Sequence, residues 1–420
     1  MQTKYPFIYI GSDTLEALSS YCSKQKLDCF TLVTDQNIYP RWGEPVQKTL
    51  RDLGFNVQSI ILEGDPITPD ENYLIKILLR TNDAPCTYLA VGSGTITDMV
   101  RFVADRTQSA FISLPSAPSM DGYASSGSSL TIQGLKQTVI ARPPIAIFAD
   151  LPTLSKAPRD MIAAGFGDVF GKFTALADWA MGNLTIRDPY DPNLAGRVSK
   201  RLEQSVKLID HLEDAWEQNI YALTDALLDV GLCMLEMGNS RPASGSEHSC
   251  SHYWEMKLLR EGRPAIYHGT KVGIASMLMA ERYEWIKKID IDEVNTRLAS
   301  TPMPILEDEI STIRKVYGSI ADDIIRSQKI YLEMTPEEYH KVQERISSHW
   351  PDIQALARSV PSPEEMGRLL HKAGLPVEPE EINLTKEDVK EALYYGHYLR
   401  NPFTIIKLLR MLGIDVVTGE

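Results

Sequence analysis

Two histidines four residues apart, His248 and His252, mark the stretch where the sequence most plainly offers chemistry. They lie in SEHSCSHYWEMKLL, where Ser246 is a candidate N-cap and apolar residues recur at helical spacing. A spacing of four places both imidazoles on one face of a helix. A third histidine, His268, follows on a separate element. Imidazole is the commonest metal ligand, although histidines on an amphipathic helix are also compatible with a purely structural role.

Asp168 is the carboxylate that best complements these histidines. It lies in GFGDVFGKFTALADW, an apolar neighbourhood in which a buried carboxylate needs a partner. Helix capping would satisfy it, and so would metal coordination. Together Asp168, His248 and His268 offer one carboxylate and two imidazoles. This ligand set suits zinc, iron or nickel and leaves a coordination position for substrate.

A glycine-containing turn, GSGTITD at 92–98, is a candidate phosphate site. Its glycines let the backbone approach a ligand, and the helix that follows offers free amides at its N-terminus. The third glycine of the dinucleotide fingerprint is missing, so an ordinary strand-to-helix turn is the alternative. Asp35, at the end of an earlier strand, would accept from ribose hydroxyls and favour NAD over NADP. A turn or N-cap aspartate is the alternative there.

The elements that must position these residues divide into an α/β half and a helical half. In the first half, apolar strand patterns alternate with helical patterns, which predicts βαβ units and a parallel sheet covered on both faces. A serine-rich loop at 115–127 follows a strand, where open α/β sheets bind ligands. The predicted strands are 7–11, 30–34, 57–62, 87–91, 110–114 and 145–149, with a hairpin at 128–132 and 138–141 and helices at 14–24, 46–53, 70–80 and from Met99.

From Arg159 onward helical spacing dominates, so we predict a domain boundary near residue 151. The two predicted domains are residues 1–151 and 152–420. The predicted helices of the second half are 159–182, 195–217, 219–236, 246–260, 269–288, 309–328, 336–346, 363–373, 386–396 and 402–412.

Composition limits the class of function. The chain has 420 residues, 43% hydrophobic and 24% charged, as in a soluble protein of two or three domains. Its net charge of −13 argues against a general affinity for nucleic acid or anionic membranes. Five scattered cysteines without a CxxC motif predict no disulfide framework and a reducing compartment. MQTKYPFIYIG lacks a signal-peptide pattern and no apolar run has membrane-spanning length, so we predict a cytoplasmic protein.

Four motifs together resemble those of a known family: GSGTITD at 92–98, PSAPSMDGYASSGSSL at 115–130, GFGD at 165–168, and the three histidines in order. Over nearly its whole length the chain resembles the metal-dependent polyol dehydrogenases related to dehydroquinate synthase and iron-containing alcohol dehydrogenase. The nearest branch is sn-glycerol-1-phosphate dehydrogenase. The resemblance implies an α/β Rossmann-like dinucleotide-binding domain at 1–151, an all-α metal- and substrate-binding domain at 152–420, and an active site in the cleft.

The resemblance also implies roles for individual residues. By similarity, Asp168, His248 and His268 hold the metal, and Asp121 and His252 are the catalytic residues that contact substrate. Asp35 is a predicted cofactor-binding residue because of its place at the end of a strand. The other predicted cofactor-binding residues match the family's pyrophosphate loop (Gly92, Ser93, Gly94, Thr95 and Asp98) or its serine-rich loop (Ser116, Ser119 and Ser125).

The implied reaction is the reversible, NAD(P)H-linked reduction of dihydroxyacetone phosphate to sn-glycerol 1-phosphate by a homo-oligomer, with a dimer favoured. No nucleic acid or membrane partner is expected. Three alternatives stay open: a glycerol or other polyol dehydrogenase, a dehydroquinate-synthase-like lyase, and a non-catalytic nucleotide- or metal-binding protein. The ligand set does not distinguish zinc, nickel and iron.

Overall fold

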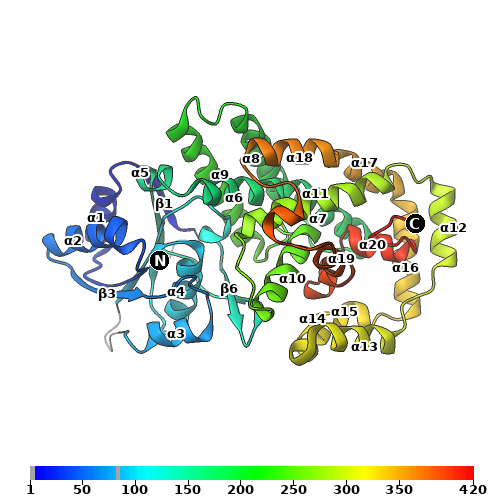
Figure 1. The fold of residues 1–420 in the computed structure, drawn as a ribbon, viewed down its shortest axis with the longest axis horizontal. Helices are drawn as coiled ribbons and strands as arrows, with labels where there is room; N and C mark the ends of the chain where they lie inside the picture. The colour runs from blue at the N-terminus through cyan, green and yellow to red at the C-terminus, as the bar shows by residue number, and fades with distance from the viewer. Residues whose placement is uncertain (1–4, 82–85) are drawn as a thin grey trace. The chain divides into compact units, whose positions relative to one another are not determined.

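The computed structural model describes residues 5–81 and 86–420 of the chain (Figure 1). Its contacts group the chain into two compact units. The first, called the sheet unit, comprises Met1–Val169 and Glu203–Asn239. The second, called the helical unit, comprises Phe170–Leu202 and Ser240–Glu420. The sheet unit is therefore built from two separate stretches of sequence. The predicted domain division near residue 151 stays a prediction.

The sheet unit is organised around a parallel sheet. Within the described residues, six strands pair in the order β1-β8-β5-β4-β2-β3, and all these pairings are parallel. Three strands, β4, β5 and β8, are buried along their whole length, as expected for apolar strands covered on both faces. The predicted fold class is thus confirmed. The strands are β1 (Phe7–Gly11), β2 (Cys29–Asp35), β3 (Asn56–Leu62), β4 (Thr87–Gly92), β5 (Phe111–Pro115) and β8 (Ala146–Asp150).

Helices cover both faces of this sheet. Alternate residues of β2 enter different cores: Leu32 packs with α1 (Thr14–Gln25) and α2 (Glu44–Asp52), whereas Val33 packs with α3 (Glu71–Leu78) and α4 (Gly94–Arg106). The other elements of the sheet unit are η1 (Tyr39–Gly43), η2 (Gly122–Ala124), the hairpin β6 (Gly127–Ile132) and β7 (Leu135–Ile140), α5 (Leu151–Ser155), α6 (Arg159–Phe170) and α9 (Trp216–Met237).

The chain leaves the neighbouring strands β2 and β4 in opposite directions. After β2 it runs to the edge strand β3, and after β4 it runs to β5 on the other side. Such a point is a topological switch point, where α/β sheets bind ligands beyond the carboxyl ends of the strands. Asp35 ends β2 and Gly92 ends β4, so two predicted cofactor residues flank the switch point.

The helical unit contains the elements that carry the histidines. Two predicted helices are each two helices in the structure: 159–182 is interrupted at Gly171, and 309–328 is divided into α13 and α14. Three helices of this unit, α12, α15 and α17, were not predicted. The elements from α7 onward, apart from α9, are α7 (Lys172–Ile186), α8 (Pro192–Ile209), α10 (Ser246–Arg260), α11 (His268–Ile286), α12 (Ile291–Ser300), α13 (Leu306–Tyr317), η3 (Gly318–Ile320), α14 (Ala321–Ser327), α15 (Lys329–Leu332), α16 (Pro336–Ser348), α17 (Trp350–Ser359), α18 (Pro363–Lys372), η4 (Pro379–Ile382), α19 (Lys386–Tyr395), η5 (Gly396–Leu399) and α20 (Ile405–Met411). In the described part of the chain, no helix combines the length and apolarity needed to cross a membrane.

One cysteine pair corrects the expectation drawn from the scattered cysteines. Cys29 and Cys86 form a disulfide although they are 57 residues apart in sequence. The parallel pairing of β2 with β4 sets Phe30 opposite Thr87, so the residues preceding these two also become neighbours. The prediction of no disulfide framework did not anticipate this pair, because sheet order is not visible in cysteine spacing. The other three cysteines are buried.

Candidate active site

Asp168, His248 and His268 converge in the structure. Asp168 lies near the end of α6 and is fully buried, His248 lies in the first turn of α10, and His268 is the first residue of α11. A carboxylate oxygen of Asp168 and one ring nitrogen of each histidine all lie within 4.8 Å of one another. Small side-chain movements would let such atoms share one cation at bond lengths of about 2.0–2.2 Å. The predicted convergence is confirmed, whereas metal binding stays a prediction.

The loop at residues 115–127, called the serine loop, holds the Asp168 carboxylate. The backbone amide of Asp121 donates to Oδ2 of Asp168 at 2.9 Å. The loop approaches α6 closely because Gly165 has no side chain: a Cβ added there would lie 1.9 Å from the carbonyl oxygen of Pro118. Gly231 on α9 plays the same part, since an added Cβ would lie 2.4 Å from the carbonyl oxygen of Asp121. The first glycine of GFGD therefore has a steric role that positions the aspartate of the same motif.

His248 contacts a buried carboxylate from its own helix. Its Nδ1 lies 2.7 Å from Oε1 of Glu247, which is fully buried. Burial raises the pKa of the Glu247 carboxyl, while hydrogen bonds from Gly245 and Thr174 oppose the shift. Sequence reasoning missed Glu247, because consecutive residues of a helix normally point in different directions.

Ser246 does not cap α10 as predicted. It is the first residue of the helix, and the N-cap position belongs to Gly245. The hydroxyl of Ser246 instead donates to Oδ2 of Asp178 at 2.6 Å, and its amide donates to the same oxygen at 2.8 Å. Gly245 permits this arrangement, since a Cβ there would lie 2.6 Å from the same Asp178 oxygen. A buried carboxylate from α7 thus anchors the start of the histidine helix.

His252 lies beside the other two histidines and is partly exposed. Its ring centroid is 6.1 Å from that of His248 and 5.8 Å from that of His268. Its Nδ1 lies 3.8 Å from Oε2 of Glu255, and Nζ of Lys271 lies 3.2 Å from the same carboxylate oxygen. The three histidine rings thus lie near one another, and the catalytic roles of His252 and Asp121 stay predictions.

Three of the predicted cofactor residues, Asp35, Gly92 and Ser116, lie next to one another at the switch point of the sheet. Gly92 has a φ of 153°, which favours glycine, and its carbonyl accepts from the amide of Ser116 at 2.9 Å. A Cβ added to Gly92 would lie 3.5 Å from Oδ2 of Asp35, so the two strand ends are adjacent. Oδ1 of Asp35 accepts from two amides of the following turn, those of Asn37 and Ile38, at 2.9 Å each. The turn interpretation of Asp35 therefore holds, and Oδ2 is directed toward the glycine turn.

The stretch at 92–98 is shorter as a turn than the sequence indicated. Helix α4 begins at Gly94, with Ser93 at the N-cap position, so Thr95 and Asp98 are already helical. Ser93 and Thr95 are partly exposed in this first turn. In the serine loop, Ser119 is partly exposed, whereas Ser116 and Ser125 are buried. Cofactor contacts by these residues stay predictions.

Asp98 has a partner that sequence reasoning overlooked. Arg101, one turn later on α4 and fully buried, donates to Oδ1 of Asp98 at 2.5 Å. Its guanidinium also donates to the carbonyls of Gly122, Tyr123 and Gly127, at 2.7–3.0 Å. Burial raises the pKa of Asp98 to about 6, and the charge of Arg101 opposes the shift. An arginine at i+3 in an apolar helix was the available signal for this tie between α4 and the serine loop.

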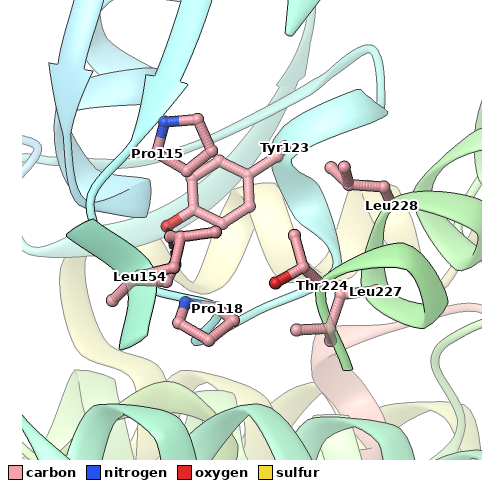
Figure 2. Close-up of a pocket in the computed structure, with 8 residues that line it drawn as sticks. Pro115, Pro118, Tyr123, Leu154, Thr224, Leu227 and Leu228 are labelled. Atoms are coloured by element: carbon pink, nitrogen blue, oxygen red, sulfur yellow. Dashed lines mark hydrogen bonds between the residues drawn. The ribbon is translucent and has the colours of Figure 1, made fainter. Parts of the chain in front are cut away.

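An apolar pocket lies under the serine loop (Figure 2). Pro118 and Tyr123 of the loop face Leu154, Leu227 and Thr224, the last three coming from α5 and α9. None of the candidate catalytic or metal residues lines it. Its lining shows that apolar side chains of the serine loop pack on α5 and α9.

Comparisons with known proteins agree with this arrangement. Residues 9–158 match the family described as iron-containing alcohol dehydrogenase. The chain is 32% identical over 407 residues to the glycerol-1-phosphate dehydrogenase (NAD(P)+) of Geobacillus stearothermophilus, covering 96% of this chain and 92% of that protein. It is 33% identical over 405 residues to the protein of the same name from Bacillus subtilis (strain 168), covering 96% and 90%.

A solved structure supports the fold independently. The glycerol dehydrogenase of Schizosaccharomyces pombe matches with a TM-score of 0.62, covering 97% of this chain and 88% of that one, at 16% identity. At that identity the similarity concerns the fold alone. The bacterial relatives, in contrast, are similar enough in sequence over their length to show family membership. The chain belongs to the glycerol-1-phosphate dehydrogenase family, within the iron-containing alcohol dehydrogenase superfamily.

Proposed function

We propose that the protein catalyses the reversible reduction of dihydroxyacetone phosphate to sn-glycerol 1-phosphate with NADH or NADPH. The observation that carries the proposal is the convergence of Asp168, His248 and His268 in a member of this family. The bacterial relatives that support it bear the name of an NAD(P)+-linked glycerol-1-phosphate dehydrogenase.

The donor set fits a divalent cation. One carboxylate and two imidazoles with ligand atoms within 4.8 Å suit zinc, nickel or iron and leave a position for substrate. When bound, such a cation polarises a carbonyl as a Lewis acid, and a reduced nicotinamide supplies the hydride. The protein's part is orientation: the Asp121 amide fixes Oδ2 of the fully buried Asp168, and α10 and α11 pack together to present the two histidines.

We propose His252 as the group that donates the proton required to form the hydroxyl of the product. It lies beside the imidazoles of His248 and His268, and 17% of its side chain is exposed, so its ring can reach a bound substrate. His248 and His268 cannot donate this proton while they ligate a metal. Oε2 of Glu255 lies 3.8 Å from Nδ1 of His252 and 3.2 Å from Nζ of Lys271, so a small side-chain movement would be needed before these groups could return a proton to the imidazole. We assign Asp121 to substrate contact, since its backbone already lies against Asp168.

The nucleotide would lie at the switch point. The backbone from Gly92 to Gly94 leads into the N-terminus of α4, where free amides and the helix dipole favour a pyrophosphate. Oδ2 of Asp35 is placed to accept from ribose hydroxyls and to repel a 2′-phosphate, which favours NADH over NADPH. We extend the proposal to a cytoplasmic homodimer, as the sequence analysis expected.

An NADH-oxidation assay tests the proposal. The protein, loaded in turn with zinc, nickel or iron, is given dihydroxyacetone phosphate or unphosphorylated dihydroxyacetone, and the chirality of the product is determined. We expect turnover of the phosphorylated substrate to sn-glycerol 1-phosphate and its loss in Asp168→Ala. Turnover of only the unphosphorylated ketone would indicate a polyol dehydrogenase.

Two other outcomes separate the remaining alternatives. Turnover of a dehydroquinate-synthase-type substrate without net change in NADH would indicate a lyase that uses NAD catalytically. Binding of metal and nucleotide without turnover of any of these substrates would indicate a sensor. Either outcome would replace the proposal.

A further inference from the structure

Glu247 has both carboxylate oxygens engaged although it is fully buried. Oε1 accepts from the amide of Gly245 at 2.7 Å and lies 2.7 Å from Nδ1 of His248. Oε2 lies 2.7 Å from the hydroxyl of Thr174 on α7. The side chain is therefore fixed at three points, one of which is a ring nitrogen of a candidate metal ligand. Burying a carboxylate without compensating contacts costs free energy, so a buried carboxylate beside a candidate metal ligand indicates a specific role.

This geometry favours one tautomer of His248. Oε1 already accepts an N–H from Gly245, which favours it as an acceptor toward Nδ1 as well, so we assign the imidazole proton to Nδ1. The conclusion does not depend on the charge of Glu247, because a proton on the carboxyl would be placed on Oε2 toward Thr174. With Nδ1 protonated, the lone pair of the ring belongs to Nε2, which is the nitrogen left for a metal.

The two histidines of α10 differ in this respect. Nδ1 of His248 lies 2.7 Å from a carboxylate oxygen of Glu247, within hydrogen-bond distance, whereas Nδ1 of His252 lies 3.8 Å from Oε2 of Glu255, beyond that distance. Both rings lie on the same helical face, so spacing alone does not select one as ligand. The carboxylate at Nδ1 favours His248 as the ligand, because ligating histidines usually donate their second ring N–H to a carboxylate or carbonyl.

We infer that Glu247 is a positioning residue that fixes the tautomer and ring orientation of His248 for metal binding. The inference rests on the metal site of the proposed function and deepens it by adding a residue outside the three ligands. It also explains why Gly245 precedes the pair: a Cβ there would lie 2.9 Å from Oε2 of Glu247, too close for the carboxylate to keep its place.

Zinc affinity of the substrate-free protein tests the inference. Zn²⁺ binding is measured by competition with a chromophoric chelator, at a temperature where circular dichroism shows each variant to be folded. Glu247→Gln keeps an oxygen for Gly245 and Nδ1 but removes the charge, and Glu247→Ala removes both. We expect affinity to fall about 10-fold in Glu247→Gln and about 100-fold in Glu247→Ala. Asp168→Ala, which removes a ligand outright, sets the upper end of the scale.

Asp178→Asn is the matched control. Asp178 is also a buried carboxylate that anchors the start of α10, through Ser246 and the hydroxyl of Tyr283, but it does not contact His248. We expect this variant to lower the melting temperature while changing zinc affinity less than Glu247→Gln does. Side-chain NMR spectra of the histidine nitrogens give a direct readout, with His248 protonated at Nδ1 in the wild type and a tautomer mixture in Glu247→Ala.

Each remaining outcome has a definite meaning. Wild-type zinc affinity in Glu247→Gln and Glu247→Ala would overturn the inference, as would an equal loss in Asp178→Asn, which would show a general effect on α10. If Glu247→Ala does not fold, Glu247→Gln decides alone. A wild-type protein that binds none of zinc, nickel and iron would overturn both the metal site and this inference. Loss of the proposed reaction with the expected order of zinc affinities would overturn only the reaction.

Discussion

Replacing Gly165 by alanine should move the serine loop away from α6. An added Cβ lies 1.9 Å from the carbonyl oxygen of Pro118, whereas ordinary contact begins at 3.4 Å. The backbone must therefore shift by 3.4 − 1.9 = 1.5 Å. Because the obstacle is a backbone atom, no side-chain rotation relieves the contact. A shift of that size breaks the 2.9 Å hydrogen bond between the Asp121 amide and Asp168.

The magnitude of the effect follows from two opposing terms. Overpacking of a well-packed contact costs about 1–3 kcal/mol, and this contact is at the severe end. Alanine has a better helix propensity than glycine by about 1 kcal/mol, which offsets part of the cost. We expect a net destabilisation of about 2 kcal/mol. We also expect turnover to fall about 100-fold, since a misplacement of about 1 Å at a reacting centre has an effect of that order.

Gly196→Ala on α8 is the control, because that glycine is exposed and an added Cβ meets nothing within 4 Å. Thermal unfolding and initial rates with dihydroxyacetone phosphate are measured for both variants. The control should be as stable as the wild type or slightly more so, with unchanged activity. Gly165→Ala with wild-type stability and rate would refute the steric account of the GFGD glycine.

His268→Ala should abolish turnover while NADH binding, followed by nicotinamide fluorescence, survives; joint loss of both would contradict separate metal and nucleotide sites. Arg101→Ala leaves the Asp98 carboxylate buried without its cation and should cost about 3–5 kcal/mol in thermal unfolding, whereas Arg106→Ala, whose side chain is 54% exposed, should cost about 0–1 kcal/mol. Burial raises the pKa of Asp388, but hydrogen bonds from a neighbouring arginine and from its helix cap lower it to about 2. A carboxyl with a depressed folded pKa stabilises above its unfolded pKa of about 4, so the melting-temperature difference between wild type and Asp388→Asn should be largest above pH 4 and shrink toward pH 2. A difference that stays constant down to pH 2 would contradict this assignment.

The strands and most of the helices could be predicted from sequence because their patterns are local. Apolar runs bounded by turn residues mark β1 to β5 and β8, but nothing local encodes the order in which they pair, so the Cys29–Cys86 disulfide was not predicted. Helices α12 and α17 were missed for a related reason. Each has only ten residues and buries two or three of them, such as Val294 or Ile353, so its packing on neighbouring helices contributes more to its stability than its own short length can.

The site could be predicted as far as residue type alone carries information. A carboxylate and two imidazoles in widely separated motifs indicate a metal centre before any fold is known. Glu247 and Arg101 could not be found in that way, because their parts depend on partners that only the folded chain brings near. The same holds for Gly165, whose role depends on the carbonyl of Pro118, 47 residues earlier.

The two-part sheet unit has a consequence for synthesis. Leu227 and Leu228 of α9 cover the apolar side of the serine loop around Tyr123, yet α9 begins 65 residues after β8 ends, since residues 151–215 lie between them. A ribosome adding about 5–20 residues per second therefore finishes α9 roughly 4–17 s after β8. During that interval the nascent chain exposes the apolar residues that α9 later covers, and a chaperone can bind to them.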